Sequence, residues 1–532
     1  MGRTGARVEP KWHTDTAQAL KLRSTPKLQA PIICSQRTTT QEQCMDSDTV
    51  TVATPAPARR RYPDLPGPRG LPIVGNLHQV DRARMHQSVE AWAHEYGPYF
   101  RFRIGDRRFL GVADHEALMT LMRDRPDGVR RGAKLERIWQ EMGFANGVFT
   151  AEGDAWKRQR RMVMAGFDPA HVRAYFPALQ RVANRLHGRW SGAARAGTSI
   201  DLQSDLMRFT VDAIAGLALG SDVNTLESDT EVIQQHLDRI FPAMFRRVMS
   251  PLPLWRWFKR PADRALDTAV AAVNQSIVGF VAQARERLAQ DPTRRERPHN
   301  LLEAMLVAAQ AEDSGVNDAD VAGNVLTMLL AGEDTTANTL AWMLYLLSRN
   351  PQALERARSE VLGVFGDEGE ITHQGLAQLD FVEACAHETM RLKPVAPFIG
   401  LELQRDTVIA DIDVPKGTVI WAVMRHDSVR AEHFPEPQVF RPERWLADGG
   451  PGQAASSAKR VSMPFGGGPR VCPGRYLALL EMKMCMAMLL QRFDIDTIST
   501  PDGAEAREVL EFTMRPDGLR MTLHARAAIS KQ

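Results

Sequence analysis

A glycine-rich stretch toward the C-terminus holds a cysteine whose setting could bind a metal or attack an electrophile. It reads Phe-Gly-Gly-Gly-Pro-Arg-Val-Cys-Pro-Gly from Phe465 to Gly474, and an apolar helical pattern at 476–493 follows. Successive glycines allow unusual φ angles and a close approach of the backbone to a flat, bulky group. Pro473 suits the first position of a helix. Cys472 would then lie among unpaired N–H groups at the positive helix end, which favours a thiolate, either a metal ligand or a nucleophile.

The same stretch fits the pattern Phe-x-x-Gly-x-Arg-x-Cys-x-Gly. With it the chain resembles the cytochrome P-450 (heme-thiolate) family. The resemblance implies that Cys472 is the proximal iron ligand of a non-covalently held heme b, iron protoporphyrin IX. It also implies that Arg470 binds a heme propionate, that Phe465 shields the sulfur and that Gly474 belongs to the heme-binding loop. The alternative is a packed cysteine in an ordinary glycine-rich hairpin.

A second chemical signal lies inside the longest apolar helical pattern, at 317–349. This pattern is apolar on nearly all sides and predicts a helix through the core, yet 331–336 reads Ala-Gly-Glu-Asp-Thr-Thr. Carboxylates and a glycine are costly inside a buried helix, and such conflicts are expected at functional sites. The block is similar to the family's distal signature, where the helix opens. The likeness implies that Asp334 and Thr335 are the catalytic pair that supplies protons to dioxygen; a kink bonding its own backbone is the alternative.

Two further motifs gain meaning only beside the first two. Trp156 and Arg160 are four residues apart and share a face of a predicted helix. The resemblance implies that they bind a heme propionate, although an amphipathic surface helix also fits. Glu388 and Arg391 are three apart, and the resemblance implies a buried ion-pair triad with Arg444. Glu-x-x-Arg alone also describes a solvated helix face.

The rest of the sequence predicts the helices and strands that position these residues. Alternation on either side of Gly105-Asp106 indicates a hairpin, and 174–316 is mostly helical in pattern. Strands are predicted at 99–104, 107–112, 407–409, 413–414 and 418–423. The resemblance covers 63–523 and implies a mainly α fold with small β-sheets (α+β), the family's triangular prism.

Composition bounds the class of protein. The 532 residues are 44% hydrophobic and 25% charged, as in globular proteins. A net charge of +3 without a dominant basic block argues against nucleic acid as a partner. Five scattered cysteines argue against a disulfide framework and favour a reducing, cytoplasmic compartment. No stretch reaches the roughly 18 consecutive apolar residues of a membrane span. We therefore expect a soluble, bacterial-type and monomeric member without a transmembrane segment.

The first 60 residues have a different character. They are rich in Thr, Gln, Arg and Pro without lasting periodicity, which predicts a disordered N-terminal tail at 1–60. A transit peptide at 1–44, or a start at Met45, is the alternative. The catalytic domain is expected at 61–532.

Because Asp334, Thr335 and Cys472 are all present, we expect a monooxygenase that inserts one atom of O2 into a small hydrophobic substrate. A heme-thiolate peroxygenase, isomerase or dehydratase of the same fold is one alternative. A non-catalytic heme sensor or carrier is another.

Electrons are expected from a separate ferredoxin or flavodoxin with its reductase, because the chain ends soon after the cysteine motif. Lys157, Arg158, Arg161 and Lys483 could form a basic docking face for such a partner. An ordinary solvated face is the alternative.

Overall fold

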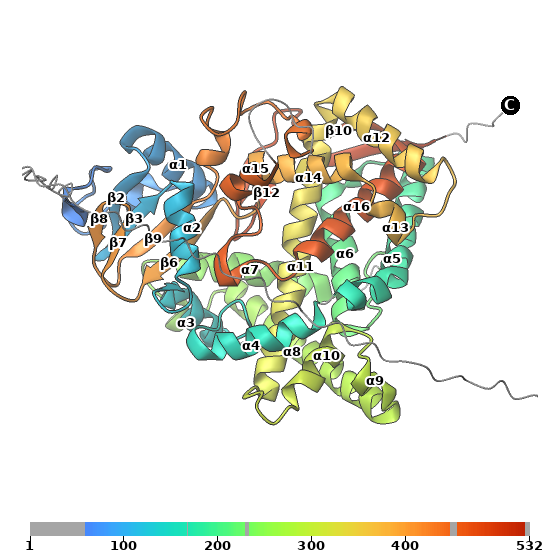
Figure 1. Cartoon of the computed structure of the whole chain (residues 1–532), viewed down its shortest axis with the longest axis horizontal. Coiled ribbons are helices and arrows are strands. Elements are labelled where there is room, and N and C mark those ends of the chain that lie inside the picture. Colours follow the sequence, from blue (N-terminus) through green and yellow to red (C-terminus); the bar gives the residue numbers. More distant parts are fainter. Residues whose placement is uncertain (1–58, 168, 229–232, 447–454, 527–532) are drawn as a thin grey trace, which may run out of the picture. The chain divides into compact units, whose positions relative to one another are not determined.

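The long apolar pattern forms one unbroken helix, α11 (Asp318–Ser348), through the middle of the fold (Figure 1). This computed structural model describes residues 59–167, 169–228, 233–446 and 455–526. The side chain of Asn317 accepts a hydrogen bond from Asp320 N–H, and the Asp320 carboxylate accepts one from Asn317 N–H. This capping box starts the helix within one residue of the predicted position. Most of α11 is buried because α6, α14 and α16 pack around it.

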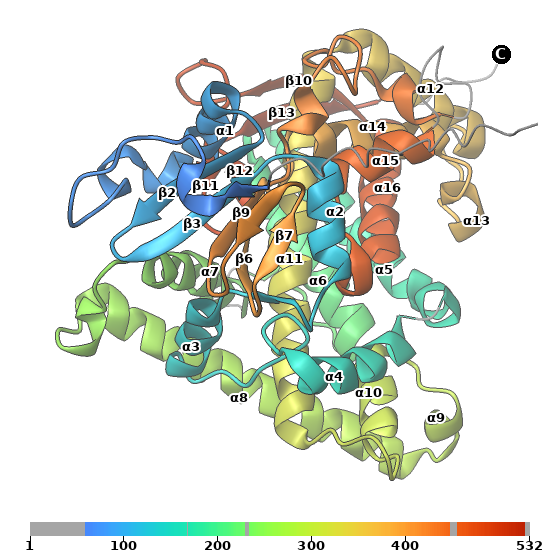
Figure 2. The same ribbon diagram turned by 60° about the vertical axis from the view of Figure 1, so that its left-hand side comes forward.

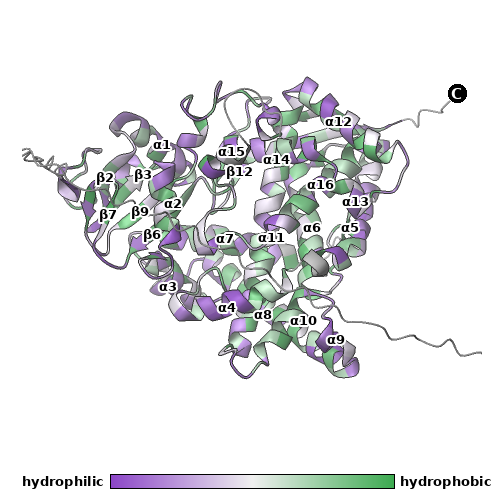
Figure 3. Ribbon diagram, viewed as in Figure 1, coloured by the Kyte–Doolittle hydropathy of each residue, from purple (hydrophilic) through white to green (hydrophobic). Residues whose placement is uncertain are grey.

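In the described part of the chain, fifteen further α-helices accompany α11, and α5 to α10 confirm the mostly helical prediction for 174–316. The other helices are α1 (Met85–Tyr96), α2 (His115–Arg123), α3 (Ala133–Glu141), α4 (Gly153–Gly166), α5 (Pro169–Ala196), α6 (Leu202–Ile214), α7 (Ile233–Met249), α8 (Pro261–Gln290), α9 (Thr293–Glu296), α10 (Leu301–Ala309), α12 (Pro351–Phe365), α13 (His373–Leu376), α14 (Asp380–Leu392), α15 (Ala455–Ser462) and α16 (Arg475–Arg492). Figure 3 shows hydrophobic colour along α10 and hydrophilic colour on α9, which matches the buried and exposed roles of these helices.

The described strands form four small sheets, the largest with the order β2-β3-β9-β6-β4. All five predicted strands are present, with shifts of one residue at the start of β8 and β9. The strands are β1 (Arg60–Arg61), β2 (Tyr99–Ile104), β3 (Arg107–Val112), β4 (Val129–Arg131), β5 (Ile200–Asp201), β6 (Phe398–Leu403), β7 (Thr407–Ile409), β8 (Ile412–Val414), β9 (Val419–Val423), β10 (Phe493–Ser499), β11 (Glu508–Leu510), β12 (Met514–Pro516) and β13 (Arg520–Ala525). Figures 1 and 2 show the five-stranded sheet on one side of α11 and helices α5 and α16 on the other.

The first described strand begins at Arg60, one residue before the expected start of the catalytic domain. Arg60 pairs with Ile412 in a parallel ladder between β1 and β8, and its guanidinium lies 2.7 Å from the Asp411 carboxylate. The charged ladder therefore begins the folded unit before residue 61. Residues 1–58, to which the disorder and transit-peptide predictions apply, lie outside the described residues.

One helix among the described residues, α8, is long and apolar enough to cross a membrane. The mean hydropathy of its most apolar window is 1.4, and 28% of that window is buried. It packs against α7, α10 and α11 as an element of the fold. Length and composition alone are weak grounds for a membrane span.

Candidate functional site

Cys472 lies in a tight loop that ends just before α16. Its backbone N–H donates a hydrogen bond to the carbonyl oxygen of Phe465, 3.0 Å away. Gly466 and Gly468 adopt φ angles of +72° and +66°, in the left-handed region that favours glycine. A Cβ atom on Gly468 would lie 2.2 Å from the carbonyl oxygen of Met122 on α2. The glycines are therefore required by the turn and by the close approach of α2.

The electrostatic setting of the sulfur differs from the prediction. Burial raises the pKa of the Cys472 thiol, and this outweighs the hydrogen bond from Gly474 N–H and the charges of Arg160 and Arg475, which lower it. Gly474 is the N-cap of α16, so Pro473 precedes the helix instead of opening it. The expectation that the setting at the helix end favours the thiolate is therefore wrong, because burial has the larger effect on the pKa of Cys472. A coordinated metal ion would supply the missing positive charge.

Arg470 belongs to a cluster with two arginines that the sequence did not single out, Arg125 and Arg131. Burial, together with the neighbouring positive charges, lowers the pKa of Arg470 and Arg131 to about 10 and that of Arg125 to about 9. The Glu152 carboxylate faces them, 2.6 Å from Arg470 Nη2. Five buried guanidinium nitrogens of this arginine cluster have no hydrogen-bond partner among the described residues. Three cations opposite one anion, with donors to spare, fit a ligand with two carboxylates, as heme b has.

The predicted pair on α4 divides between two tasks. Trp156 is buried, and the guanidinium carbon of Arg470 lies 4.7 Å from the centre of its ring. Arg160 Nη2 donates a hydrogen bond to the carbonyl oxygen of Val471, 2.8 Å away. Trp156 thus supports the arginine cluster, whereas Arg160 holds the cysteine loop. Propionate binding by Arg160 stays a prediction.

On α11, Thr335 and Ala331 line a small apolar cavity of about 70 Å³, which we call the distal pocket. Its other lining residues are Trp139, Phe149, Phe241, Thr327, Leu330, Phe512 and Thr513. Thr335 Oγ1 donates a hydrogen bond to the carbonyl oxygen of Ala331, 2.7 Å away. The helix is continuous here, so the predicted opening is not seen; the hydroxyl bonds the preceding turn without breaking it.

Asp334 is held by a different segment. Thr513 Oγ1 donates a hydrogen bond to Asp334 Oδ2, 2.9 Å away. Burial raises the pKa of Asp334 to about 6, Thr513 opposes the rise, and the charge of Asp238 adds to it. The pKa of neighbouring Glu333 lies well above its ordinary value because of burial and the charges of Asp238 and Asp334. Asp334 can therefore gain and lose a proton near neutral pH.

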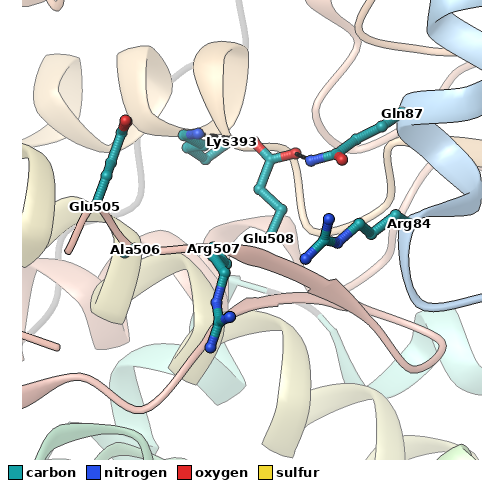
Figure 4. A pocket seen from close by; sticks show the side chains of 7 residues that line it. All are labelled: Arg84, Gln87, Lys393, Glu505, Ala506, Arg507 and Glu508. Carbon is teal, nitrogen blue, oxygen red and sulfur yellow. Dashed lines mark hydrogen bonds and ion pairs between the residues drawn. The ribbon is translucent and has the colours of Figure 1, made fainter. Parts of the chain in front are cut away.

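The loop with Phe512 and Thr513 is secured by the charged base of its hairpin, β11–β12. The Glu508 carboxylate lies 2.7 Å from both Lys393 Nζ and Arg425 Nη1, and 2.8 Å from His86 Nε2. Figure 4 shows Glu508 and Lys393 in a charged cavity of about 290 Å³. This larger cavity shares no lining residue with the distal pocket, and we assign it a supporting role.

The predicted triad is present with full burial of its carboxylate. Arg391 Nε and Nη2 donate to the two oxygens of Glu388, each at 2.8 Å. Arg444 Nε lies 3.1 Å from Glu388 Oε1, and Trp445 Nε1 lies 2.9 Å from Oε2. These bonds join α14 to the segment that follows the β-sheet, confirming the geometry expected from the resemblance.

The predicted docking face loses one member. Lys483 is buried on α16, and its Nζ lies 2.6 Å from Glu383 Oε2. Lys157 pairs with Asp127 at 3.2 Å. Lys483 therefore contributes to internal packing, and its assignment to a docking surface is wrong.

The residues of the candidate site lie within a stretch that resembles known proteins. The family model described as Cytochrome P450 matches residues 65–523. The chain is 26% identical over 442 residues to Protein LUTEIN DEFICIENT 5, chloroplastic, of Arabidopsis thaliana, covering 81% of this chain and 72% of that protein. It is 30% identical over 476 residues to the self-sufficient cytochrome P450 monooxygenase CYP505E4 of Penicillium expansum.

The fungal protein is much longer than this chain. The match covers 86% of this chain but only 43% of CYP505E4. The chain thus spans less than half the length of the self-sufficient relatives it matches. These relatives come from a plant and a fungus, and they give no support to the expected bacterial type.

The solved heme domain of cytochrome P450DA shares the fold. The TM-score is 0.75 at 23% identity, over 87% of this chain and 98% of that one. The mainly α fold with small sheets is thereby confirmed. With its cysteine loop and a family match over most of its length, the chain belongs to the cytochrome P450 family of heme-thiolate monooxygenases.

Proposed function

We propose that this protein inserts one atom of O2 into a small hydrophobic organic substrate. The observation that carries the proposal is the pair on α11: Asp334, with a pKa of about 6, adjoins Thr335, which lines an apolar pocket. A carboxyl that titrates near the working pH is suited to repeated proton transfer. Helix α11 also packs against α16, which starts just after Cys472, so the pair and the cysteine belong to one packed assembly.

The proposed cofactor is heme b, held by this chain's own donors. Cys472 would bind the iron through its sulfur. The arginine cluster and Trp156 would bind the two propionates, and Arg470 itself belongs to the loop that contains Phe465 and Gly474. When bound, heme supplies reductive activation of dioxygen, which no side chain can perform.

The protein's contribution to the reaction is proton control. Asp334 Oδ2 accepts the Thr513 hydroxyl hydrogen bond, which leaves Oδ1 to hold a proton. Thr335 Oγ1 donates to Ala331 in this structure, and rotation of its hydroxyl would direct it into the distal pocket. Asp334 would resupply protons, and Thr335 would orient them.

The substrate class follows from the pocket lining. Four of the nine lining residues are aromatic, namely Trp139, Phe149, Phe241 and Phe512, and the Phe241 and Phe512 rings stack with centres 4.5 Å apart. Such a wall excludes water and favours compact apolar molecules over charged ones.

The electron source is proposed more broadly than the sequence predicted. A separate ferredoxin or flavodoxin with its reductase remains one candidate. A reductase in the same polypeptide is the other, because the relatives named self-sufficient extend far beyond the matched part. A cytoplasmic location and a monomeric state stay predictions.

The test begins with the heme. Reduced protein under carbon monoxide should give the red-shifted absorption of a sulfur-ligated heme, and Cys472→Ser should abolish it. The wild type, supplied with electrons and a panel of apolar compounds, should then incorporate ¹⁸O from labelled dioxygen. A normal spectrum without oxygen incorporation across the panel would favour the sensor alternative.

A variant separates the monooxygenase from a peroxygenase or isomerase. Thr335→Ala should lower the product formed per NADPH several-fold while NADPH consumption continues. Thr335→Ser, which keeps the hydroxyl, serves as the control. Equal product yield in the alanine variant would argue for the peroxygenase or isomerase.

A further inference from the structure

Two histidines and an aspartate converge between the start of α2 and the loop after β9. His115 is the first residue of α2, and its Nδ1 lies 2.8 Å from Asp427 Oδ2. His433, farther along the loop, places its Nε2 3.8 Å from the same oxygen. The three donor atoms lie within 4.8 Å of one another. We propose that His115, Asp427 and His433 form a binding site for a divalent transition-metal ion, separate from the heme site.

The distances suit such an ion. Tetrahedral zinc with bonds of about 2.0–2.1 Å holds its ligand atoms about 3.3 Å apart. The two separations from Asp427, 2.8 Å and 3.8 Å, each lie about 0.5 Å from that value, and the two histidine nitrogens lie within 4.8 Å of each other, so side-chain rotations that draw the histidines together would close the site. The rings of His115 and His433 already meet edge to face, with centres 4.8 Å apart.

A fourth residue gives the site an outer layer. His426 Nδ1 lies 3.0 Å from Asp427 Oδ1, the oxygen that the proposed ion would not use. Carboxylates that bind metals are commonly held by such second contacts. His426 Nε2 is buried without a hydrogen-bond partner among the described residues, and the His94 ring centre lies 5.2 Å from the His426 ring. An imidazole-rich ligand set of this kind favours zinc, copper or nickel over calcium or magnesium.

The proposed site is open to solvent on one side, and it connects helix α2 to the loop after β9. The side chain of His433 is 28% exposed, compared with 13% for His115 and 8% for Asp427, so an ion can enter past His433 and keep water as a fourth ligand. The hydrogen bond from His115 N–H to Asp427 Oδ2, at 2.9 Å, already orients the carboxylate toward the helix. A bound ion would strengthen the connection of α2, which packs against the cysteine loop, to the loop after β9.

The competing explanation is a hydrogen-bond network in which Asp427 merely anchors α2. Zinc binding separates the two. A chelator first removes loosely bound metal ions from the full-length, heme-loaded protein. The protein is then titrated with Zn²⁺ in competition with a fluorescent zinc chelator, which reports the Zn²⁺ affinity. The wild type should bind Zn²⁺ at this site, and its melting temperature should rise. His433→Gln and His115→Gln should each weaken this binding by at least about tenfold, as expected when a direct ligand is lost.

The matched control is His524→Gln. His524 is also paired with carboxylates, with its Nδ1 2.6 Å from Asp496, but its side chain is 60% exposed. This variant should bind Zn²⁺ like the wild type. Unchanged Zn²⁺ affinity in His433→Gln, or an equal loss in His524→Gln, would overturn the proposal.

A spectroscopic measurement checks the ligand set independently of the variants. Zinc-edge X-ray absorption of the wild type with one equivalent of Zn²⁺ should show imidazole and oxygen ligands and no sulfur. A spectrum with sulfur ligands or without imidazole would also overturn the assignment.

Discussion

Asp334 shows how one residue can combine structural cost with chemical use. Its carboxyl is partly buried beside Glu333, whose pKa is also raised, and the hydroxyl of Thr513 offsets part of the cost. An ordinary surface aspartate is fully ionised at neutral pH, whereas Asp334 with a pKa of about 6 exchanges its proton readily. The residue therefore destabilises the fold at the pH where its chemistry is useful.

The first prediction uses this cost. Because the folded-state pKa of Asp334 is raised from 3.8 to about 6, its stability contribution is present at low pH and is lost as pH rises through 6. Between pH 5 and 7.5 the wild type should lose about 1.4 kcal/mol relative to Asp334→Asn, which cannot ionise. Chemical unfolding of both proteins across this range measures the difference.

Asp154→Asn is the control for Asp334→Asn, because the side chain of Asp154 is 83% exposed. Its stability profile should follow the wild type. A constant difference between wild type and Asp334→Asn at all pH values would show that the carboxyl is not perturbed.

The arginine cluster leads to a second prediction at the residue scale. Removing one arginine should raise the stability of the heme-free protein and lower its affinity for heme. Arg125→Met removes one of three crowded, buried cations, so heme-free protein should become more stable. The same change removes donors for a propionate, and hydrogen bonds to charged groups contribute roughly 1.5–3 kcal/mol each. Heme affinity should therefore fall at least about tenfold. Heme transfer to an acceptor protein and thermal unfolding of the apoprotein provide the two measurements.

Arg161→Met, on the exposed face of α4, is the matched control and should change neither quantity. Loss of apoprotein stability in Arg125→Met, with heme affinity unchanged, would mean that Arg125 is simply a packed side chain.

At the scale of elements, buried ion pairs join segments that are distant in sequence. Glu388 on α14 accepts hydrogen bonds from Arg391, Arg444 and Trp445, and Glu508 connects the β11–β12 hairpin to Lys393 and Arg425. The first cluster supports the segment ahead of the cysteine loop. The second supports the hairpin that supplies Thr513 to Asp334. The cysteine loop and Asp334 are thus both supported by buried ion pairs that lie outside the candidate site itself.

Glu388→Ala should therefore destabilise the protein strongly. Removing one partner of a buried ion pair leaves the others uncompensated, at a cost of roughly 3–5 kcal/mol. Glu432→Ala, which breaks the exposed pair with Arg430, should cost less than about 1 kcal/mol. Denaturant unfolding of the two variants compares them, and equal effects would show that the triad is not energetically special.

At the scale of the whole molecule, the open question is how electrons arrive. The family match fills residues 65–523, and the self-sufficient relatives extend well beyond the matched length. We predict that the 532-residue chain with NADPH alone shows no substrate-stimulated turnover, because the match to the heme-thiolate family occupies residues 65–523. Added ferredoxin and its reductase should restore turnover. Turnover with NADPH alone would contradict this prediction.

Much of the fold could be predicted because the signals were local. The glycine-rich cysteine motif, the capped helix α11 and the β2–β3 hairpin depend on turn preferences and on hydrophobic periodicity over short distances. The triad of Glu388, Arg391 and Arg444 was found through the family resemblance, since Glu-x-x-Arg alone is common on solvated helices. The structure confirmed each of these elements within one or two residues.

Other features required side chains from distant segments to meet. Arg125 and Arg131 lie in a polar segment whose sequence is typical of a solvated loop. Only tertiary packing places them beside Arg470. Thr513 lies far from Asp334 in sequence, and the histidines around Asp427 show no ligand spacing along the chain. The prediction that Cys472 favours the thiolate failed for the same reason, because burial depends on the surrounding elements.

By itself, the sequence was enough to indicate the family and to predict Cys472 as the sulfur ligand and Asp334 and Thr335 as the acid–alcohol pair, because each motif is made of neighbouring residues in one short segment. Only the tertiary structure showed the raised pKa of Asp334, the clustering of Arg125 and Arg131 with Arg470, and the convergence of His115, Asp427 and His433. Burial and long-range electrostatics arise when segments pack together, and a linear pattern does not contain them.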